Sequence, residues 1–378
     1  MKKLSFVLIL LALSQGIHSQ IIEKVIDSAR IEKLDEVLVK AIRVEASSPI
    51  THSNVSKAEL ATRNLGQDLP ILLNYLPSVV TTSDAGAGIG YTGIRVRGVS
   101  AQSTNITING IPYNDAESLG TFWVDLPDFA SSVESLQLQR GVGTSTNGSG
   151  AFGASINILT DAISKDSQAE ISNTFGSYNT LKHNLKFSTG LLGSNIEISG
   201  RLSQIQSDGY IDRASSNLRS WYLSAGWVGK QTVLKGVAFS GKEITYQSWY
   251  GTPESVVFGT AADRNHYADR NGLSDAERQN LLNSGRTYNY YTYQNQVDHY
   301  QQDNYQLHLT HRFKNQKWVL NGAGHYTYGR GYYEEYRTED ELSTYQMSPV
   351  ILGGDTVSSS DLIRRRWLDN HFIGSIYA

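Results

Sequence analysis

The sequence of 378 residues has nearly balanced charge, with 33 basic and 36 acidic side chains and a formal net charge of −3. So small a net charge produces no global field that would attract nucleic acid, and we expect no nucleic-acid partner. The absence of cysteine excludes disulfides, thiolate metal sites, a cysteine nucleophile and a lipid-modified N-terminal cysteine. The 22 tyrosines and 6 tryptophans suit a surface that is apolar on one side and wet on the other.

Residues 1–19 have the order of a secretory signal peptide. Lys2 and Lys3 form a basic start, residues 4–13 form an apolar run, and small or polar residues follow up to Ser19. The run is shorter than the ~20 residues that a membrane-spanning helix needs, and no later segment supplies such a run. We therefore expect an exported protein without a transmembrane helix; a buried N-terminal helix is the alternative.

Residues 20–48 form a charged leader that predicts extended or partly disordered chain. One segment in it combines an acidic start with strand-like apolar content: Asp35, Glu36, Val37, Leu38, Val39, Lys40 and Ala41. Taken alone, this segment fits equally an edge strand of the following domain or a strand that adds to the sheet of a partner.

Residues 49–160 predict a small α+β domain. Ser56 and Glu59 have the spacing of a capping box at a helix start. A run of leucines falls on one helix face, which Pro77 then ends: Leu69, Leu72, Leu73 and Leu76. Alternating strand patterns follow, with apolar positions at Ile94, Val96, Ile106, Ile108, Val133, Leu136, Leu138, Ile156 and Ile158.

Residues 161–378 change to segments in which apolar and polar side chains alternate. Along 195–203, for example, Ile196, Ile198 and Leu202 share one face, opposite Glu197 and Arg201. This period of two is typical of a transmembrane β-barrel, although a soluble β-sandwich also alternates. Export, recurrent Tyr and Trp near segment ends, and short turns alternating with a long polar stretch at 250–298 favour the barrel.

No pattern in the sequence indicates chemistry on a substrate. Residues 148–153 match G-x-G-x-x-G, but a β-type segment follows them where a dinucleotide site needs a helix. The histidines show no pair at metal-ligand spacing, and no nucleophile lies beside a base. We expect no catalytic residue, no metal site and no cofactor, and hence not an enzyme.

Four motifs in the α+β domain occur in a fixed order: IRVRG at 94–98, ITINGIP at 106–112, VESLQLQRG at 133–141 and GAFGASINI at 150–158. This series resembles the plug domain of TonB-dependent outer-membrane receptors. The resemblance implies a TonB box at 35–41 that pairs with a TonB-type periplasmic energy-coupling protein. It also implies a place in the outer membrane of a Gram-negative bacterium, in contact with outer-membrane lipid.

The strand-end motifs suggest a lock between plug and barrel. An arginine there can pair with a carboxylate of the barrel wall, in a contact that is firm yet breakable, and glycines permit tight turns. The expected lock residues are Arg95, Arg97, Gly98, Glu134, Arg140 and Gly141. The alternative is that these arginines only stabilise the plug's own fold.

By the same resemblance, the loops at 83–91, 99–104 and 113–123 reach the extracellular side and contact ligand. Their aromatic and polar side chains suit the binding of a chelate. The expected ligand-binding residues are Ser83, Asp84, Tyr91, Gln102, Ser103, Tyr113, Asn114, Asp115, Phe122 and Trp123.

A plug of this size needs a barrel of about 22 strands, whereas residues after 160 have room for about ten. The expected fold is therefore an α+β plug domain followed by antiparallel transmembrane β-barrel strands of an incomplete, truncated barrel. The expected function is TonB-dependent uptake of a scarce ligand such as an iron-siderophore, haem or another metal chelate. A surface receptor that binds or signals without import is one alternative, although the short leader leaves no room for a signalling domain. An outer-membrane barrel enzyme is the other.

Overall fold

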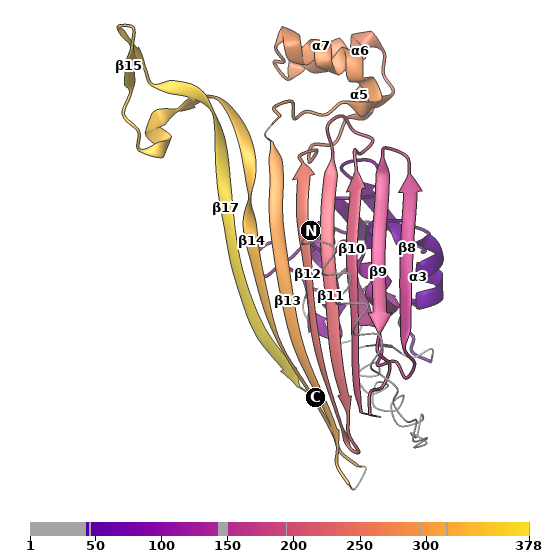
Figure 1. Cartoon of the computed structure of the whole chain (residues 1–378). Coiled ribbons are helices and arrows are strands. Elements are labelled where there is room, and N and C mark those ends of the chain that lie inside the picture. The colour runs from indigo at the N-terminus through magenta and orange to yellow at the C-terminus, as the bar shows by residue number, and fades with distance from the viewer. Residues whose placement is uncertain are drawn as a thin grey trace, which may run out of the picture.

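The computed structural model describes residues 43–44, 47–142, 150–193, 195–294, 296–314 and 317–377. The expected signal peptide and the segment 35–41 lie outside the described residues. Two parts are evident: an N-terminal α+β domain, the expected plug, and an eight-stranded antiparallel sheet, which we name the wall. Figure 1 shows the plug (indigo to purple) against one face of the wall, behind β8 to β12.

The plug contains a five-stranded sheet with the order β1-β6-β7-β4-β5 and a separate β2-β3 hairpin. Its strands are β1 (His52–Ser56), β2 (Val79–Ser83), β3 (Thr92–Val96), β4 (Thr104–Ile108), β5 (Ile111–Pro112), β6 (Val133–Arg140) and β7 (Ala154–Thr160). Its helices are α3 (Lys57–Arg63), α4 (Leu69–Leu72) and the 3-10 turns η2 (Ala101–Ser103), η3 (Trp123–Asp125) and η4 (Phe129–Ser132).

The local predictions for the plug hold, with one correction. Ser56 Oγ accepts a hydrogen bond from the Glu59 nitrogen, and the Glu59 carboxylate accepts one from the Ser56 nitrogen, so the capping box at the start of α3 is confirmed. The predicted leucine helix is wrong in length, because α4 ends at Leu72 and 3-10 turns continue the chain to Pro77. All four leucines are nevertheless buried, because these turns keep them on one side of the chain.

The core of the plug lies on the apolar faces of β4, β6 and β7, and side chains of the wall complete it. Ile106, Leu136 and Ile156 are among its fully buried residues. Tyr222 and Phe239 of the wall belong to the same cluster, and the Phe239 ring lies 5.1 Å from that of Phe129. Burial of apolar surface shared between the plug and the wall therefore holds the two parts together.

The wall is a meander in which each strand pairs with the next, in the order β17-β14-β13-β12-β11-β10-β9-β8. Its strands are β8 (Gln168–Gly176), β9 (Thr180–Ser188), β10 (Ile196–Ser207), β11 (Ser216–Val228), β12 (Thr232–Tyr246), β13 (Val297–Arg312), β14 (Val319–Glu341) and β17 (Ser359–Tyr377). The expectation of about ten spanning strands is wrong for the described residues. The sequence estimate assumed ~10 residues per strand, whereas the last three strands have 16, 23 and 19.

The alternation along the wall separates an apolar face from a polar one as predicted. In β10, Leu202 is 58% exposed, whereas its neighbour Arg201 on the other face is 2% exposed beneath the plug. In β13, Leu307 is 56% exposed, whereas its neighbour Gln306 on the inner face is 7% exposed. An exposed apolar face and a covered polar face are the arrangement expected of a sheet whose outer surface contacts lipid. Within the described ranges, no helix has the length and apolar character needed to cross a membrane.

The polar stretch predicted as a long loop folds into helices at one end of the wall, which we name the helical end (Figure 1). These are α5 (Glu254–Val257), α6 (Ala261–Arg270), α7 (Asp275–Ser284) and the turn η6 (Gly285–Thr287). Capping boxes start both longer helices, and a small core forms around Val256, Ala268 and Leu281. Between β14 and β17, the turn η7 (Leu342–Tyr345) precedes the hairpin β15 (Val350–Leu352) and β16 (Asp355–Val357).

Candidate functional site

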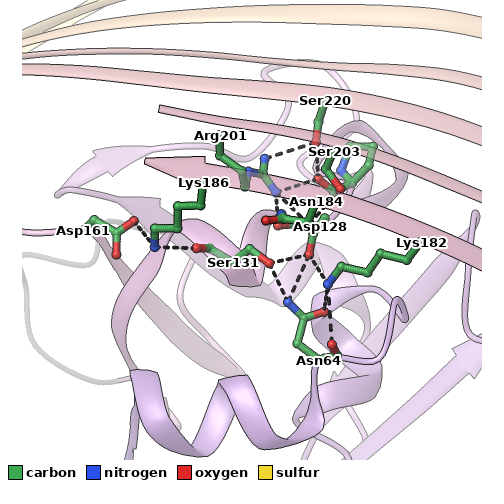
Figure 2. A network of polar contacts seen from close by, with 11 residues as sticks. Asn64, Asp128, Ser131, Asp161, Lys182, Asn184, Lys186, Arg201, Ser203 and Ser220 are labelled. Carbon is green, nitrogen blue, oxygen red and sulfur yellow. Dashed lines mark hydrogen bonds and ion pairs between the residues drawn. The ribbon is translucent and has the colours of Figure 1, made fainter. Parts of the chain in front are cut away.

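A buried carboxylate of the plug is the centre of the polar contact with the wall. Asp128 starts η4 with a positive φ of 52°, in the left-handed region that aspartate tolerates better than most residues. Figure 2 shows the side chains that converge on it from the wall and the plug. Its two oxygens contact Lys182 Nζ at 2.6 Å, Asn184 Nδ2 at 2.5 Å, Ser203 Oγ at 2.7 Å, Arg201 Nη1 at 3.4 Å, Asn64 Nδ2 at 3.0 Å and Ser131 Oγ at 2.6 Å.

The charges in this cluster, which we name the Asp128 latch, are withdrawn from water. The side chains of Asp128, Lys182 and Arg201 are 0%, 3% and 1% exposed. Burial alone would raise the pKa of Asp128, but the charges of Arg201 and Lys182 outweigh it and lower the pKa to about 2. Asp128 therefore stays ionised and carries the charge that compensates two buried cations of the wall.

A second ion cluster fixes the plug where the chain passes into the wall. Asp161 binds Lys57 Nζ of the plug and Lys186 Nζ of β9, each at 2.6 Å. Its backbone carbonyl also accepts a hydrogen bond from Lys235 Nζ of β12 at 2.6 Å. Burial raises the pKa of Asp161, yet the pKa is lowered on balance because Lys186 and Lys57 stabilise the carboxylate.

Two of the residues expected to lock the plug against the wall, Arg140 and Glu134, contact other residues of the plug. Arg140 donates to the Pro77 carbonyl at 2.9 Å and to Ser53 Oγ at 2.6 Å, both within the plug. Glu134 pairs with Lys57 at 3.1 Å. The side chains of Arg95 and Arg97 are exposed, and Gly98 and Gly141 occupy turns with positive φ.

Sequence reasoning missed the Asp128 latch, although part of its signal was visible. Lys182, Lys186 and Arg201 lie on the polar face of predicted strands, where buried cations require carboxylate partners. The carboxylate is 54 positions from Lys182 and 73 from Arg201, too far for any local pattern.

A cavity of about 490 Å³ lies between the plug and the wall near the helical end. The described residues that line it are Asp84, Tyr91, Asp115, Glu117, Ser118, Phe122, Asp125, Glu243, Trp249, Asp298, Tyr300, Gln302, Tyr333, Leu368 and Asn370. Four of the ten residues expected to bind ligand are among them: Asp84, Tyr91, Asp115 and Phe122. We name this space the acidic cavity.

Carboxyl groups of the plug (Asp125) and of the wall (Glu243 and Asp298) line the acidic cavity and have few hydrogen-bond partners among the described residues. The Tyr91 hydroxyl contacts Asp298 Oδ2 and lies 3.4 Å from Glu243 Oε1. One oxygen each of Asp125, Glu243 and Asp298 is buried without a hydrogen-bond partner among the described residues. Burial, together with the nearby charges of Asp298 and Asp115, raises the pKa of Asp125 well above its usual range.

Aromatic rings form much of the remaining lining of the acidic cavity. The Trp249 ring centroid lies 5.5 Å from that of Tyr91, 5.5 Å from that of Tyr333 and 6.3 Å from that of Tyr291, all edge to face. Trp249 follows β12 and Tyr333 belongs to β14, so this packing joins the plug to strands well apart in the sequence. Edge-to-face contacts of this kind fix the orientation of the rings.

A second cavity, of about 450 Å³, lies beside the first, and Asp115, Phe122, Asp125 and Gln302 line both. Tyr113 and Asn114 line this second space. Asn114 also supports the loop, because its amide contacts the Ile106 nitrogen at 2.7 Å and the carbonyls of Thr104 and Leu119 at 2.9 Å.

The other expected ligand residues lie elsewhere. Trp123 is 3% exposed and belongs to the plug core, so its prediction as a ligand contact is wrong in this conformation. Ser83 accepts a hydrogen bond from the Gly88 nitrogen at 2.9 Å, and neither it nor Gln102 or Ser103 is among the described residues that line either cavity. In the part of the chain that the structure describes, no three His, Asp or Glu side chains are placed to hold a metal ion.

Comparisons with known proteins agree with this architecture. Residues 44–155 match the family model of the TonB-dependent receptor plug domain. The vitamin B12 transporter of Vibrio vulnificus is 32% identical over 180 residues, covering 47% of this chain and 28% of that protein. The ferric enterobactin receptor of Pseudomonas aeruginosa is 23% identical over 252 residues, covering 61% of this chain and 33% of the receptor.

Solved structures show the same fold at low sequence identity. The open form of the ferric-catecholate import receptor Fiu from E. coli K12 aligns with a TM-score of 0.61 at 16% identity, over 88% of this chain and 46% of that one. The siderophore receptor PirA from Acinetobacter baumannii gives a TM-score of 0.56 at 15% identity, over 85% and 44%. The chain thus spans less than half the length of each of these relatives.

Proposed function

We propose that this chain, which belongs to the family of TonB-dependent receptors and is located in the outer membrane, provides the plug and part of the barrel wall of an importer of a scarce ligand. The observation that carries the proposal is the contact between plug and wall. Apolar side chains, the buried Asp128 latch and the partly exposed Asp161 cluster hold the plug against a sheet whose opposite face is apolar and exposed. A domain so held blocks a pore until some of these contacts are broken.

The orientation follows from the connections of the wall. Short turns join strands at one end, and the helices α5 to α7 form a long connection at the other. Outer-membrane barrels have short periplasmic turns and long extracellular loops, so we assign the helical end to the outside. The acidic cavity is lined by plug loops and by Glu243, Trp249 and Asp298 of the wall near this end, where an arriving ligand reaches it first. The second cavity lies beside it and is lined by His325 and Ile373, nearer the middle of the wall strands.

The proposed cycle needs no covalent chemistry. Ligand binds between the plug loops and the wall, and the plug responds by exposing the segment 35–41 to the periplasm. A TonB-type protein adds this segment to its own sheet as a strand and pulls. Charge-assisted contacts such as the Asp128 latch then separate, and the ligand passes into the periplasm.

The names of the relatives indicate which ligands to test. They include a vitamin B12 transporter, a ferric enterobactin receptor and siderophore receptors. These names favour a metal chelate such as an iron-siderophore, and haem is tested beside it as another chelate of this class. Growth of a strain lacking the receptor on single iron or cofactor sources identifies the ligand, because the missing ability appears as a specific growth defect.

Deletion of residues 37–39 tests energy coupling separately from binding. We expect accumulation of the identified ligand inside the cell to stop, while binding at the cell surface keeps its affinity. Deletion of residues 23–25, in the same leader but outside the proposed box, is the matched control and should leave both intact. If accumulation continues without residues 37–39, the coupling role is wrong; if wild-type cells bind without accumulating, the protein is a surface receptor.

A further inference from the structure

The acidic cavity has a charge composition that restricts its occupant. Six carboxyl groups line it, at Asp84, Asp115, Glu117, Asp125, Glu243 and Asp298. No lysine, arginine or histidine is among the described residues of its lining. Arg366 packs on the Tyr333 ring at 5.5 Å but does not line the cavity. An anionic ligand would meet like charge on several sides in a partly desolvated space, where repulsion is strong.

Three of these carboxyl groups are buried with too few hydrogen-bond partners among the described residues. Asp125, Glu243 and Asp298 are 4%, 2% and 4% exposed, and each has a buried oxygen with no partner among the described residues. The hydroxyl of Tyr91 contacts both Glu243 and Asp298, but a phenol has one hydrogen and can donate to only one of them at a time. Buried carboxylates left in this state require a proton or a cation.

The size and the lining of the cavity favour an organic cation over a bare metal ion. A bare metal ion needs several ligands converging at short distance, and no such group of three exists among the described residues. The carboxyl groups instead surround a space of about 490 Å³, which suits part of a small organic molecule. Five aromatic side chains share the lining: Tyr91, Phe122, Trp249, Tyr300 and Tyr333. Aromatic faces attract ammonium groups within ~6 Å of the ring centroid, Trp most strongly.

We propose that the acidic cavity binds an organic cation, an amine or quaternary ammonium group of the ligand, between the carboxyl groups of Asp125, Glu243 and Asp298 and the ring of Trp249. The inference rests on the proposed import function for the statement that this cation belongs to the imported ligand. It narrows the ligand class, because a purely anionic chelate does not fit this space.

Binding of choline and spermidine to the purified receptor in lipid nanodiscs tests the proposal. Titration calorimetry is run on the wild type and on the variants Asp125→Asn and Glu243→Gln, with Asp355→Asn as the control. Asp355 is an exposed carboxylate in the β15-β16 hairpin and is not among the described residues that line the cavity. Asp125→Asn is a mild change, because Asp125 Oδ1 has no hydrogen-bond partner among the described residues that the substitution would break.

We expect at least one of the two cations to bind the wild type and Asp355→Asn with equal affinity. In each cavity variant the affinity for that cation should fall by about tenfold or more. Trp249→Ala should weaken the binding of choline, through its quaternary ammonium group, more than Trp249→Tyr does, because a phenol ring keeps a π face. Affinity that is the same in all variants, or no binding of either cation, overturns the proposal. Saturation by Mg²⁺ alone at the same carboxyl groups also overturns it in favour of a metal site.

Uptake measured beside binding separates this inference from the import proposal. If the cations bind at the cavity but no cell accumulates them or a conjugate carrying them, import fails and the cation site stands. If ferric tris-catecholate is imported and choline and spermidine neither bind nor compete, the cation site fails and import stands.

Discussion

Replacement of Asp128 by Asn tests the contact between plug and wall with the least change in shape. The substitution removes one negative charge and leaves Lys182 and Arg201 as buried cations, 3% and 1% exposed. The new amide also points two N–H donors toward Asn184 and Ser203, which are themselves donors in this contact. Breaking a buried ion pair by removing one partner costs about 3–5 kcal/mol.

The lowered pKa of Asp128 leads to a similar figure. A shift from 3.8 to about 2 corresponds to about 2 kcal/mol of stabilisation of the ionised form in the docked plug. The range of about 3–5 kcal/mol also includes the cost of leaving two cations unpaired. We therefore expect Asp128→Asn to lower the free energy that holds the plug against the wall by about 3 kcal/mol.

Hydrogen exchange of the plug amides, followed by mass spectrometry in nanodiscs, measures this loss. A change of about 3 kcal/mol accelerates exchange from β6 and β7 by roughly 100-fold, since each 1.4 kcal/mol is a factor of ten. Asp355→Asn, an exposed carboxylate, should leave these rates unchanged. Acceleration of less than about threefold in Asp128→Asn would show that the latch does not hold the plug, and would refute the reasoning.

Two further predictions concern the same contact. Because the pKa of Asp128 is depressed, its stabilisation is complete above its ordinary value of 3.8 and is lost as the pH falls toward about 2; the difference in plug protection between wild type and Asp128→Asn should therefore disappear between about pH 4 and pH 2. Gly241→Ala places a methyl group against the Asp125 carbonyl and within 2.7 Å of Pro127 Cδ, so it should weaken docking by about 1–3 kcal/mol. Gly236→Ala, on the same strand with its nearest atom 4.0 Å away, should have little effect, and equal exchange rates in the two variants would contradict this packing.

Features set by neighbouring residues could be predicted from the sequence. The capping box of Ser56 and Glu59 and the alternation in β10 depend on contacts within a few positions or on a simple period. The ordered motifs of the plug likewise identified the domain that the family model matches at 44–155. In each case the pattern and the structure share the same physical cause, either local hydrogen bonding or burial of one face.

Features that depend on how plug and wall meet could not be predicted in this way. The cations that distinguish Asp128 from other acidic residues of the plug, Lys182 and Arg201, are contributed by β9 and β10. Leu218 and Phe239 are 0% and 2% exposed on the inner face of the wall, against the rule of a polar interior, because the plug supplies an apolar surface there. The mix of aromatic and polar side chains at 113–123 predicts Trp123 as a ligand contact, whereas the short turn η3 places it in the core.

A reversible covalent link between plug and wall tests the central claim most directly. Gly90 of the plug and Ser216 of β11 suit a disulfide, because a Cβ built on Gly90 lies 3.8 Å from Ser216 Cβ, within the usual range of about 3.5–4.5 Å. The chain contains no other cysteine, so Gly90→Cys with Ser216→Cys forms one defined bridge, at some strain from the φ of +92° at Gly90.

Uptake of the identified ligand is compared in cells carrying the oxidised and the reduced double variant, with each single variant as control. The account predicts that the bridge stops energy-dependent uptake, leaves surface binding unchanged, and releases uptake again on reduction. Undiminished uptake by receptors that are fully bridged would contradict it, because ligand would then pass without movement of the plug at this contact.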